Sequence, residues 1–370
     1  MWLQSKLSWS ISIPNNLIKG SCMKKKSILI VGSALFLASL SANISSFSSN
    51  LIKPQHLEHG DTVALISSAS RAPSNQTIRF AKERLEALGL KVVLGKHVYS
   101  RDGYFAGTDA QRAEDLNQAF SNSKIKAIFE VRGGWGSARI LPLISYDNIK
   151  KHPKIFIGFS DITSLLLAIN KKTGLETFHG TMGVEPWPEF TVKYMKKVLF
   201  DGSKVLFKNP KYKLNPKLDI IATKDPNCID VINSGIASGP LVGGNLSVLV
   251  ALLGTKYEPS WKGKILFVED IGEKNYQIDR LLSQLELAGV FSDIKGFIFG
   301  KCTNCEIAEG AYGTKTLKQI IQHYVSSKNI PAFMGSMIGH IPENFTLPEG
   351  APVTMNANQG TIKMLEPAVI

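Results

Sequence analysis

Apolar runs typical of buried strands alternate with helical patterns through the first half of the chain. The strand-like runs cover residues 62–66, 91–94 and 127–131. Apolar residues recur at helical spacing over residues 75–88 and 110–120. This alternation predicts a mainly parallel sheet covered by helices. Right-handed crossovers would bring the carboxyl ends of the strands to one edge, which is where open α/β sheets bind ligands.

The pattern becomes irregular between residues 186 and 235, where Asn-Pro and Asp-Pro steps interrupt it. We predict a linker or an irregular flap there. New strand and helix patterns follow over residues 236–370, and the last two strands, near Val353 and Ile362, are predicted to be antiparallel. A chain of 370 residues is longer than a typical domain. We therefore expect an N-terminal α/β domain over residues 54–185 and a C-terminal mixed α/β domain over residues 236–370.

The first 53 residues are interpreted as a leader followed by a flexible segment. Three lysines at positions 24–26 precede an apolar run over residues 28–38, and small residues follow up to position 42. These are the three parts of a secretory signal peptide, and the run is short for a membrane span. We expect translation to begin at Met23, cleavage near residue 42, export to the periplasm and no stable membrane insertion afterwards. An uncleaved leader that anchors the protein in the membrane and a cytoplasmic location are the alternatives.

The chain carries a formal net charge of +13, with 43 basic and 30 acidic residues. Residues 1–42 contain five lysines and no acidic residue, which leaves +8 for the remainder. The lysines are scattered and form no stripe with arginine and aromatic residues, so nucleic-acid binding is not expected. A basic surface permits attraction to an acidic wall or to an acidic peptide.

Four cysteines occur, and one of them, Cys22, lies in the predicted leader. Cys302 and Cys305 have the spacing of a redox pair or of half a zinc site, but the sequence has no second Cys or His pair at the distance that a metal requires. We therefore predict neither a metal nor another cofactor. We expect a packing role for this pair, with oxidation in an exported protein as the alternative.

Ser160 lies where a short strand-like run meets a Leu-rich helical pattern, in the sequence Gly158-Phe159-Ser160-Asp161. A serine on such a turn is a candidate nucleophile, because the turn exposes Oγ and the first amides of the helix face any negative charge that develops beside it. The motif lacks the final glycine of the G-x-S-x-G elbow of hydrolases. The alternative is a structural N-cap, since serine caps helices and Asp161 suits a first turn.

A glycine-rich loop over residues 132–136 (R-G-G-W-G) directly follows the third predicted strand. Its glycines allow a positive φ and a close approach to a ligand. The loop lacks the spacing of dinucleotide-binding and P-loop motifs. We predict that an amide near Gly134 and the amide of Asp161 form an oxyanion pocket, and that Arg132 and Trp135 contact the substrate. A tight structural turn is the alternative.

A nucleophilic serine needs a base, and the base needs an orienting carboxylate. His179 and His340 are the histidines in glycine-flanked loops after apolar runs, where a side chain is able to face a site. Glu269 and Asp270 end a strand-like run, which is a suitable position for the carboxylate. The spacing of these residues alone does not choose between the two histidines or between the two acids.

Taken together, the motifs resemble those of the LD-carboxypeptidase family of serine peptidases, which includes the microcin C immunity peptidases. The resemblance covers residues 54–365 and rests on these segments in order: 59–61 (HGD), 132–136 (RGGWG), 158–163 (GFSDIT), 243–246 (GGNL), 267–270 (FVED), 278–280 (IDR) and 339–340 (GH). It implies a triad of Ser160 as nucleophile, Glu269 as orienting acid and His340 as general base. It also implies a flavodoxin- or Rossmann-like parallel-sheet domain, a C-terminal mixed α/β domain and an active site in the cleft between them.

This resemblance implies a serine carboxypeptidase that cleaves the L,D bond of muropeptide tetrapeptides, releases D-alanine and needs no cofactor. Arg132 or Arg280 is expected to bind the free carboxylate of this small peptide substrate, and a homodimer is compatible with the sequence. Thr181, Ser145 and Phe159 depart from the family pattern, so the substrate is less defined than the reaction. The alternatives are a microcin-immunity-like peptidase acting on peptidyl or aminoacyl nucleotide conjugates, a lipase or esterase, and a non-catalytic wall-peptide-binding protein.

Overall fold

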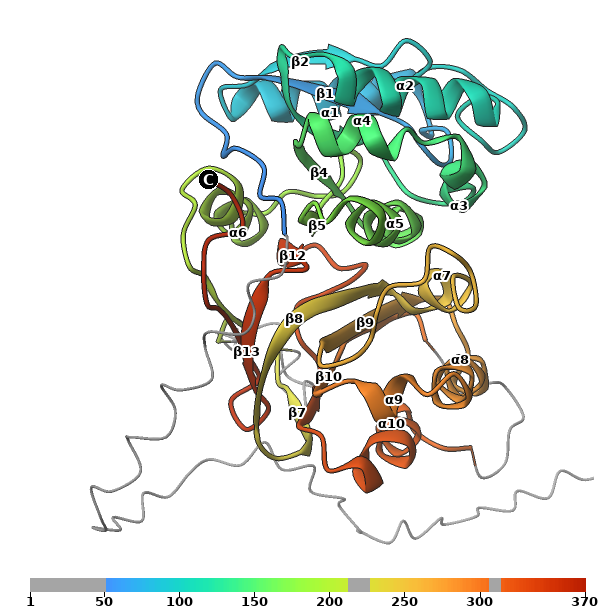
Figure 1. The fold of residues 1–370 in the computed structure, drawn as a ribbon, viewed down its shortest axis with the longest axis vertical. Helices are drawn as coiled ribbons and strands as arrows, with labels where there is room; N and C mark the ends of the chain where they lie inside the picture. The colour runs from blue at the N-terminus through green and yellow to red at the C-terminus, as the bar shows by residue number, and fades with distance from the viewer. Residues whose placement is uncertain (1–50, 212–226, 306–313) are drawn as a thin grey trace, which may run out of the picture.

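The computed structural model describes residues 51–211, 227–305 and 314–370, which form two sheets with helices packed around them (Figure 1). The first sheet has six strands in the order β12-β5-β4-β3-β1-β2. Its strands are β1 (Thr62–Ile66), β2 (Lys91–Leu94), β3 (Ile125–Glu130), β4 (Ile155–Gly158), β5 (Thr177–His179) and β12 (Leu347–Glu349). Strands β1 to β5 are parallel in the spatial order 2-1-3-4-5 of flavodoxin-like folds. The predicted parallel-sheet domain is therefore confirmed.

Helices lie around this first sheet, and those at residues 75–87, 109–121 and 163–173 follow the predicted alternation. They are α1 (Asn75–Ala87), α2 (Asp109–Ser121), α3 (Ser137–Ile140), α4 (Tyr146–Lys151), α5 (Thr163–Thr173) and α6 (Glu189–Leu199), with 3-10 turns at η2 (Leu141–Leu143) and η3 (Ser160–Ile162). Helix α2 begins with a capping box in which Thr108 and Gln111 each bond the backbone amide of the other. Helix α5 is buried over residues 163–169 because it also packs against elements of the second sheet.

The second sheet has eight strands in the order β6-β14-β13-β8-β9-β10-β11-β7. Its strands are β6 (Leu206–Lys208), β7 (Asp230–Asn233), β8 (Ile236–Asn245), β9 (Ile265–Ile271), β10 (Gly296–Thr303), β11 (Ala332–Met334), β13 (Pro352–Asn356) and β14 (Thr361–Met364). Strands β8 to β11 are parallel, and β13 pairs antiparallel with β14, as predicted. The mixed character of the C-terminal domain is thus confirmed.

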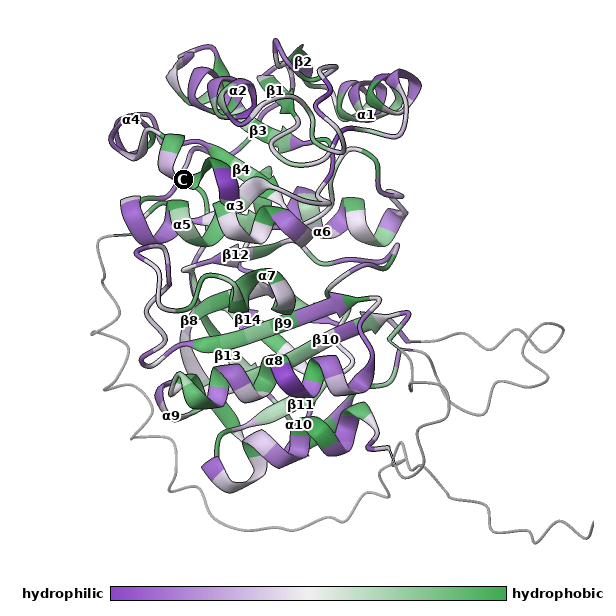
Figure 2. Ribbon diagram, turned by 90° about the vertical axis from the view of Figure 1, so that its right-hand side faces the viewer, coloured by the Kyte–Doolittle hydropathy of each residue, from purple (hydrophilic) through white to green (hydrophobic). Residues whose placement is uncertain are grey.

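The helices of the second unit are α7 (Leu246–Val250), α8 (Asn275–Leu287), α9 (Val290–Asp293) and α10 (Leu317–Val325), with a 3-10 turn at η4 (Ser326–Lys328). Figure 2 shows polar and apolar residues alternating along α8 and α10. Such alternation is expected of helices that bury one face and expose the other. The buried residues of α8, including Ile278, Leu282 and Leu285, follow this spacing.

The prediction of a linker or irregular flap over residues 186–235 is wrong for the described part of that segment. It contains α6 and the two outermost strands of the second sheet, β6 and β7. Helix α6 buries Met195, Val198 and Leu199, which makes it an amphipathic helix rather than a linker. The two strands span only three and four residues, so their apolar pattern is too short to recognise. Residues 212–226 lie outside the described residues.

Strand β12 crosses the predicted domain division. It comes from the C-terminal region, yet it pairs antiparallel with β5 at the edge of the first sheet. Leu347 of β12 lies opposite His179, and Glu349 lies opposite Thr177. The two sheets are therefore joined by a strand as well as by side-chain packing.

Cys302 and Cys305, at the end of β10, are joined by a disulfide, which is the alternative considered for the pair, and Cys302 also packs against the hydrophobic core. A separation of three residues gives a Cα–Cα distance of 5.4 Å, which lies within the range that a disulfide bridges. Within the described ranges, no helix is long and apolar enough to cross a membrane. The predicted signal peptide lies outside the described residues.

Candidate active site

Ser160 lies at the carboxyl edge of the first sheet, between β4 and α5. Its φ of +59° places a non-glycine residue in the left-handed region, a conformation that costs about 1–3 kcal/mol and clusters at functional sites. Ile162 closes the turn by donating its amide to the carbonyl of Phe159 at 3.1 Å. The Ser160 hydroxyl bonds to His340 and makes no helix cap, so the N-cap alternative is wrong.

The structure brings the three residues of the predicted triad into one hydrogen-bonded chain. His340 Nε2 lies 2.8 Å from Ser160 Oγ, and His340 Nδ1 lies 2.7 Å from Glu269 Oε2. Ser160 comes from the first sheet, whereas Glu269 is on β9 of the second. A base within hydrogen-bond reach of the nucleophile and oriented by a third group is the arrangement that activates a serine.

Glu269 is fully buried and is held by its neighbours. Asn245 Nδ2 donates to Glu269 Oε1 at 3.3 Å. A Cβ on Gly339 would lie 2.8 Å from Glu269 Oε2, so only glycine lets the backbone pass this close and place His340 beside the acid. The carbonyl of His340 accepts the hydroxyl of Thr303 at 2.8 Å, which fixes the other side of the loop.

The charge of Glu269 determines the protonation of the base. Burial alone would lower the pKa of His340, but the hydrogen bond and the negative charge of Glu269 outweigh it, and the pKa is raised above the ordinary value of 6.5. His340 is therefore a stronger proton acceptor than a free imidazole, as a general base for a serine requires.

The two alternatives that the sequence left open, His179 and Asp270, have structural positions. His179 is fully buried, with its ring centroid 5.8 Å from that of Phe159 and 5.2 Å from that of Phe267. Burial lowers the pKa of His179 to about 4, so it stays neutral. Asp270 accepts the amide and the hydroxyl of Ser247 at 3.0 and 2.7 Å and so holds the start of α7.

The glycine-rich loop lies directly against the nucleophile. A Cβ on Gly133 would lie 3.0 Å from Ser160 Cβ and 3.1 Å from the amide nitrogen of Asp161. Gly134, which the sequence analysis singled out, instead lies against Ser70. Sequence reasoning therefore missed the role of Gly133, because a run of two glycines does not show which of them faces the neighbouring turn.

Asp161 joins the loop to the nucleophile turn. Its carboxylate accepts the amide of Ser137 at 2.8 Å, and its carbonyl accepts the Ser137 hydroxyl at 2.5 Å. Ser137 Oγ also lies 2.6 Å from Ser164 Oγ. The carboxylate of Asp161 is buried and structural, which leaves its backbone amide as the group able to face a substrate.

Arg132 has unused hydrogen-bonding capacity near this site. Its Nε is buried and has no partner in the part of the chain that the structure describes, and its Nη1 makes only a 3.5 Å contact with the carbonyl of Arg71. Glu185 is close enough to Arg132 and His340 for both charges to act on its pKa, although burial is the larger effect and raises it. The sequence analysis missed Glu185, which lies in a segment without a recognisable motif.

Arg280, the other arginine predicted to bind the substrate carboxylate, lies on α8 over the ring of Tyr276, with its guanidinium carbon 5.6 Å from the ring centroid. Trp135 is 69 % exposed, and its side chain faces a separate pocket beside the glycine-rich loop. Across the described ranges, no group of three or more His, Cys, Asp or Glu side chains is arranged to hold a metal ion.

Ser160 in a strained conformation, His340 and the buried Glu269 form one hydrogen-bonded chain, which is the arrangement of a serine hydrolase site. Sequence comparison narrows this class. Residues 63–180 match the family model of the LD-carboxypeptidase N-terminal domain, and residues 238–355 match that of the C-terminal domain. The chain belongs to the LD-carboxypeptidase family.

Several known proteins are similar to this chain over most of their length. A probable murein peptide carboxypeptidase of Bacillus subtilis (strain 168) is 39 % identical over 309 residues, which cover 84 % of this chain and 93 % of the relative. The microcin C7 self-immunity protein MccF in complex with aspartyl sulfamoyl adenosine has a TM-score of 0.76 and 28 % identity, covering 86 % of this chain and 100 % of that one. The muramoyltetrapeptide carboxypeptidase of Oxalobacter formigenes has a TM-score of 0.69 and 25 % identity, covering 82 % and 97 %.

Proposed function

We propose that the protein is a serine LD-carboxypeptidase that cleaves the L,D bond of muropeptide tetrapeptides and releases the terminal D-alanine. The observation that carries the proposal is the hydrogen-bonded chain from Ser160 through His340 to Glu269 in a member of the LD-carboxypeptidase family. The names of the relatives, a murein peptide carboxypeptidase and a muramoyltetrapeptide carboxypeptidase, support this choice of substrate.

The proposed reaction proceeds through an acyl-enzyme. Ser160 Oγ attacks the carbonyl carbon of the scissile bond while His340 Nε2 takes the hydroxyl proton. The carbonyl oxygen becomes an oxyanion that accepts hydrogen bonds from the amide of Asp161 and from an amide of the loop near Gly133 and Gly134; each such donor contributes about 10²–10³ in rate.

Collapse of this intermediate breaks the C–N bond, and His340 gives its proton to the leaving amino group of D-alanine. Water then enters and attacks the ester carbon while His340 takes one of its protons. The C–Oγ bond breaks, His340 returns that proton to Ser160 Oγ, and the shortened peptide leaves with a new carboxylate. Glu269 stabilises the imidazolium in both halves of the reaction through its hydrogen bond to His340 Nδ1.

The free carboxylate of the leaving D-alanine is assigned to Arg132. A guanidinium with a buried Nε that has no partner within the described ranges offers planar donors to a carboxylate. Arg84 holds the facing loop by donating to the carbonyls of Gly183 and Glu185 at 2.9 and 2.7 Å. Glu185 belongs to that loop, and the charge of Arg132 partly opposes the effect of burial, which raises the pKa of Glu185.

The direct test is incubation of the purified protein with an L,D-tetrapeptide, followed by mass spectrometry. We expect loss of one alanine with the wild-type protein and no loss with Ser160→Ala. Ser74→Ala is the matched control, because it removes a serine that only caps α1 and costs about 1 kcal/mol of stability. An unchanged tetrapeptide mass with the wild-type protein contradicts the proposal.

A second candidate function has its own support. The MccF structure has a higher TM-score to this chain than the muramoyltetrapeptide carboxypeptidase, 0.76 against 0.69. That function would be hydrolysis of an aminoacyl or peptidyl nucleotide conjugate by the same triad. An aspartyl sulfamoyl adenosine arm in the assay separates the two, because release of aspartate without release of D-alanine supports the second candidate only.

The site of action is proposed to be the periplasm. Support comes from the three-part signal over residues 23–42. Cell fractionation and N-terminal sequencing of the mature protein test this. A cytoplasmic protein with residues 23–42 intact contradicts it, and recovery in the membrane fraction with those residues present indicates an uncleaved anchor.

A further inference from the structure

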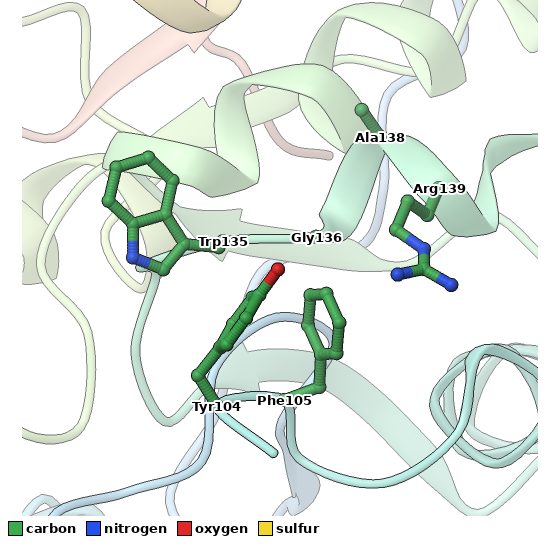
Figure 3. Close-up of a pocket in the computed structure, with 6 residues that line it drawn as sticks. All are labelled: Tyr104, Phe105, Trp135, Gly136, Ala138 and Arg139. Carbon is green, nitrogen blue, oxygen red and sulfur yellow. The ribbon is translucent and has the colours of Figure 1, made fainter. Parts of the chain in front are cut away.

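An aromatic pocket lies beside the glycine-rich loop, outside the triad (Figure 3). Its volume is about 470 Å³, and it is lined by Tyr104, Phe105, Trp135, Gly136, Ala138 and Arg139. Tyr104 and Trp135 are 61 % and 69 % exposed, which is unusual for side chains of this size. Figure 3 shows Trp135 and Tyr104 on one side of Phe105 and the guanidinium of Arg139 on the other, where it lies over the Phe105 ring, 4.8 Å from its centroid. Exposed aromatic side chains gathered in a pocket indicate a ligand.

The pocket is held in shape by a buried arginine behind it. Arg112 donates to the carbonyls of Ser68 and Gly136 at 2.7 and 2.8 Å and lies over the Phe105 ring, 4.8 Å from its centroid. A Cβ on Gly136 would lie 2.4 Å from the Phe105 ring, so the glycine lets the loop meet this ring directly. The pocket is therefore formed before a ligand arrives, which lowers the entropic cost of binding.

The pocket lies within reach of a substrate bound at Ser160. Trp135 is two residues from Gly133, which contacts Ser160, and two residues span at most about 7 Å. In a muropeptide tetrapeptide, three amino-acid residues separate the sugar from the scissile carbonyl, which is about 10 Å of extended chain. The sugar and the scissile bond are thus able to occupy the pocket and the triad at the same time.

The chemistry of the walls matches a pyranose. The Tyr104 and Phe105 rings contact each other, tilted by 48° with centroids 4.2 Å apart, and together form an aromatic wall of the pocket. Aromatic faces pack against the C–H face of a sugar ring. Arg139, whose Nη2 is 2.9 Å from Asp109, brings a charged pair to the pocket edge where hydroxyl and acetamido groups form hydrogen bonds.

We propose that this pocket binds the N-acetylmuramoyl sugar of the substrate and so makes the enzyme prefer sugar-bearing muropeptides over free peptides. This inference rests on the proposed carboxypeptidase function. It is tested with N-acetylmuramoyl-tetrapeptide and free tetrapeptide as paired substrates. We expect a KM about three- to tenfold lower for the sugar-bearing substrate with the wild-type protein.

Tyr104 is the residue to vary, because its ring is exposed and its replacement leaves the core intact. Tyr104→Leu is expected to abolish the difference in KM between the two substrates and to leave turnover of the free tetrapeptide unchanged. Tyr104→Phe keeps the aromatic ring, so it is expected to keep the difference in KM between the two substrates. Tyr276→Leu is the matched control, since Tyr276 is 56 % exposed and lies on α8, in the second unit.

Equal KM values for the two substrates with the wild-type protein overturn the inference, as does a Tyr104→Leu variant that keeps the full difference. Failure of the proposed function looks different, since the wild-type protein then releases D-alanine from neither substrate. Saturation-transfer NMR with N-acetylmuramic acid tests the pocket without turnover. We expect signal with the wild-type protein and with Tyr104→Phe, and an equal signal with Tyr104→Leu contradicts the assignment.

Discussion

Ser160 combines backbone strain with reactivity at one residue. The left-handed conformation at +59° turns Oγ toward His340 and away from the helix that follows. Its cost of about 1–3 kcal/mol is offset by the bonds that Asp161 makes with Ser137 and by the contact with His340. The strained serine is thus kept in place by polar contacts from both sheets.

Glu269→Gln tests the orienting acid. The amide nitrogen of glutamine would face His340 Nδ1 and favour the wrong tautomer, so we expect kcat/KM to fall by about 10³–10⁴ while the protein stays folded. The base must be neutral, and its pKa is raised, so wild-type kcat/KM increases with pH with a midpoint above 6.5. In the variant this midpoint moves to lower pH, which a pH–rate profile measures.

Asp270→Asn is the control for that substitution, because Asp270 bonds to Ser247 and Asn245 and not to His340. It should keep activity within about tenfold. If Glu269→Gln and Asp270→Asn lose kcat/KM equally and the midpoint of the pH–rate profile does not move, Glu269 acts on folding and not on the base.

Arg132→Ala tests recognition of the substrate carboxylate. Loss of a charge-assisted hydrogen bond costs about 1.5–3 kcal/mol, which corresponds to a KM about 10–100-fold higher for the tetrapeptide acid. A tetrapeptide with an amidated C-terminus lacks this negative charge, so Arg132→Ala should change the KM for that substrate little. Arg280→Ala is the control and should leave both values as they are. A variant that weakens acid and amide substrates equally argues against this role.

At the scale of elements, the site depends on how closely the glycine-rich loop approaches the nucleophile turn. Gly133→Ala would place a methyl group 3.0 Å from Ser160 Cβ and 3.2 Å from its Oγ. Overpacking of this kind costs about 1–3 kcal/mol, and here it displaces the nucleophile. We expect kcat to fall about 10- to 100-fold with a modest change in melting temperature, measured by acylation kinetics and thermal unfolding. An unchanged kcat would show that the turn at Ser160 accommodates the added methyl group.

The sequence predicted the elements with strong patterns and missed those without. Predicted strands 62–66 and 91–94 match β1 and β2 residue for residue, because each contains a short apolar run rich in β-branched residues. Strand β12, with only three residues, owes its place to pairing with β5, and no local pattern reports such a tertiary contact. The three residues of the proposed triad stand in motifs that carry the family resemblance, whereas Glu185 and the contact of Gly133 depend on how distant segments meet.

At the scale of the whole molecule, the two sheets are joined by a buried carboxyl group. Glu349 of β12 accepts the amide of Gly243 of β8 at 3.1 Å, so a side chain on the first sheet bonds the backbone of the second. Burial raises the pKa of Glu349 well above its ordinary value, and Lys264 only partly opposes this. Glu130 and Glu176 are also buried, and burial raises the pKa of each to about 8.

As pH rises, these buried carboxyl groups stabilise the fold less, whereas the activity that depends on neutral His340 increases. The pKa of Glu349 is raised, so the folded protein keeps the carboxyl proton at pH values above about 4.5, where the unfolded chain loses it. The contribution of Glu349 to the free energy of unfolding is therefore full below that pH and declines above it. Glu349→Gln stays neutral and still accepts from Gly243. We expect the free energy of unfolding of this variant to equal that of the wild type at low pH and to exceed it near pH 8. The difference should grow by up to about 1.4 kcal/mol per pH unit.

Chemical unfolding at pH 5 and pH 8 measures this difference, with Glu366→Gln as the control because Glu366 forms an ion pair with Lys53 that is partly exposed. A wild-type protein that is more stable than Glu349→Gln at pH 8 would show that Glu349 is ionised in the fold. Because His340 needs a pH above 6.5 to act as a base, the enzyme reaches full activity where its buried carboxyl groups stabilise it least. Glu349→Gln should therefore widen the pH range over which the protein is both folded and active.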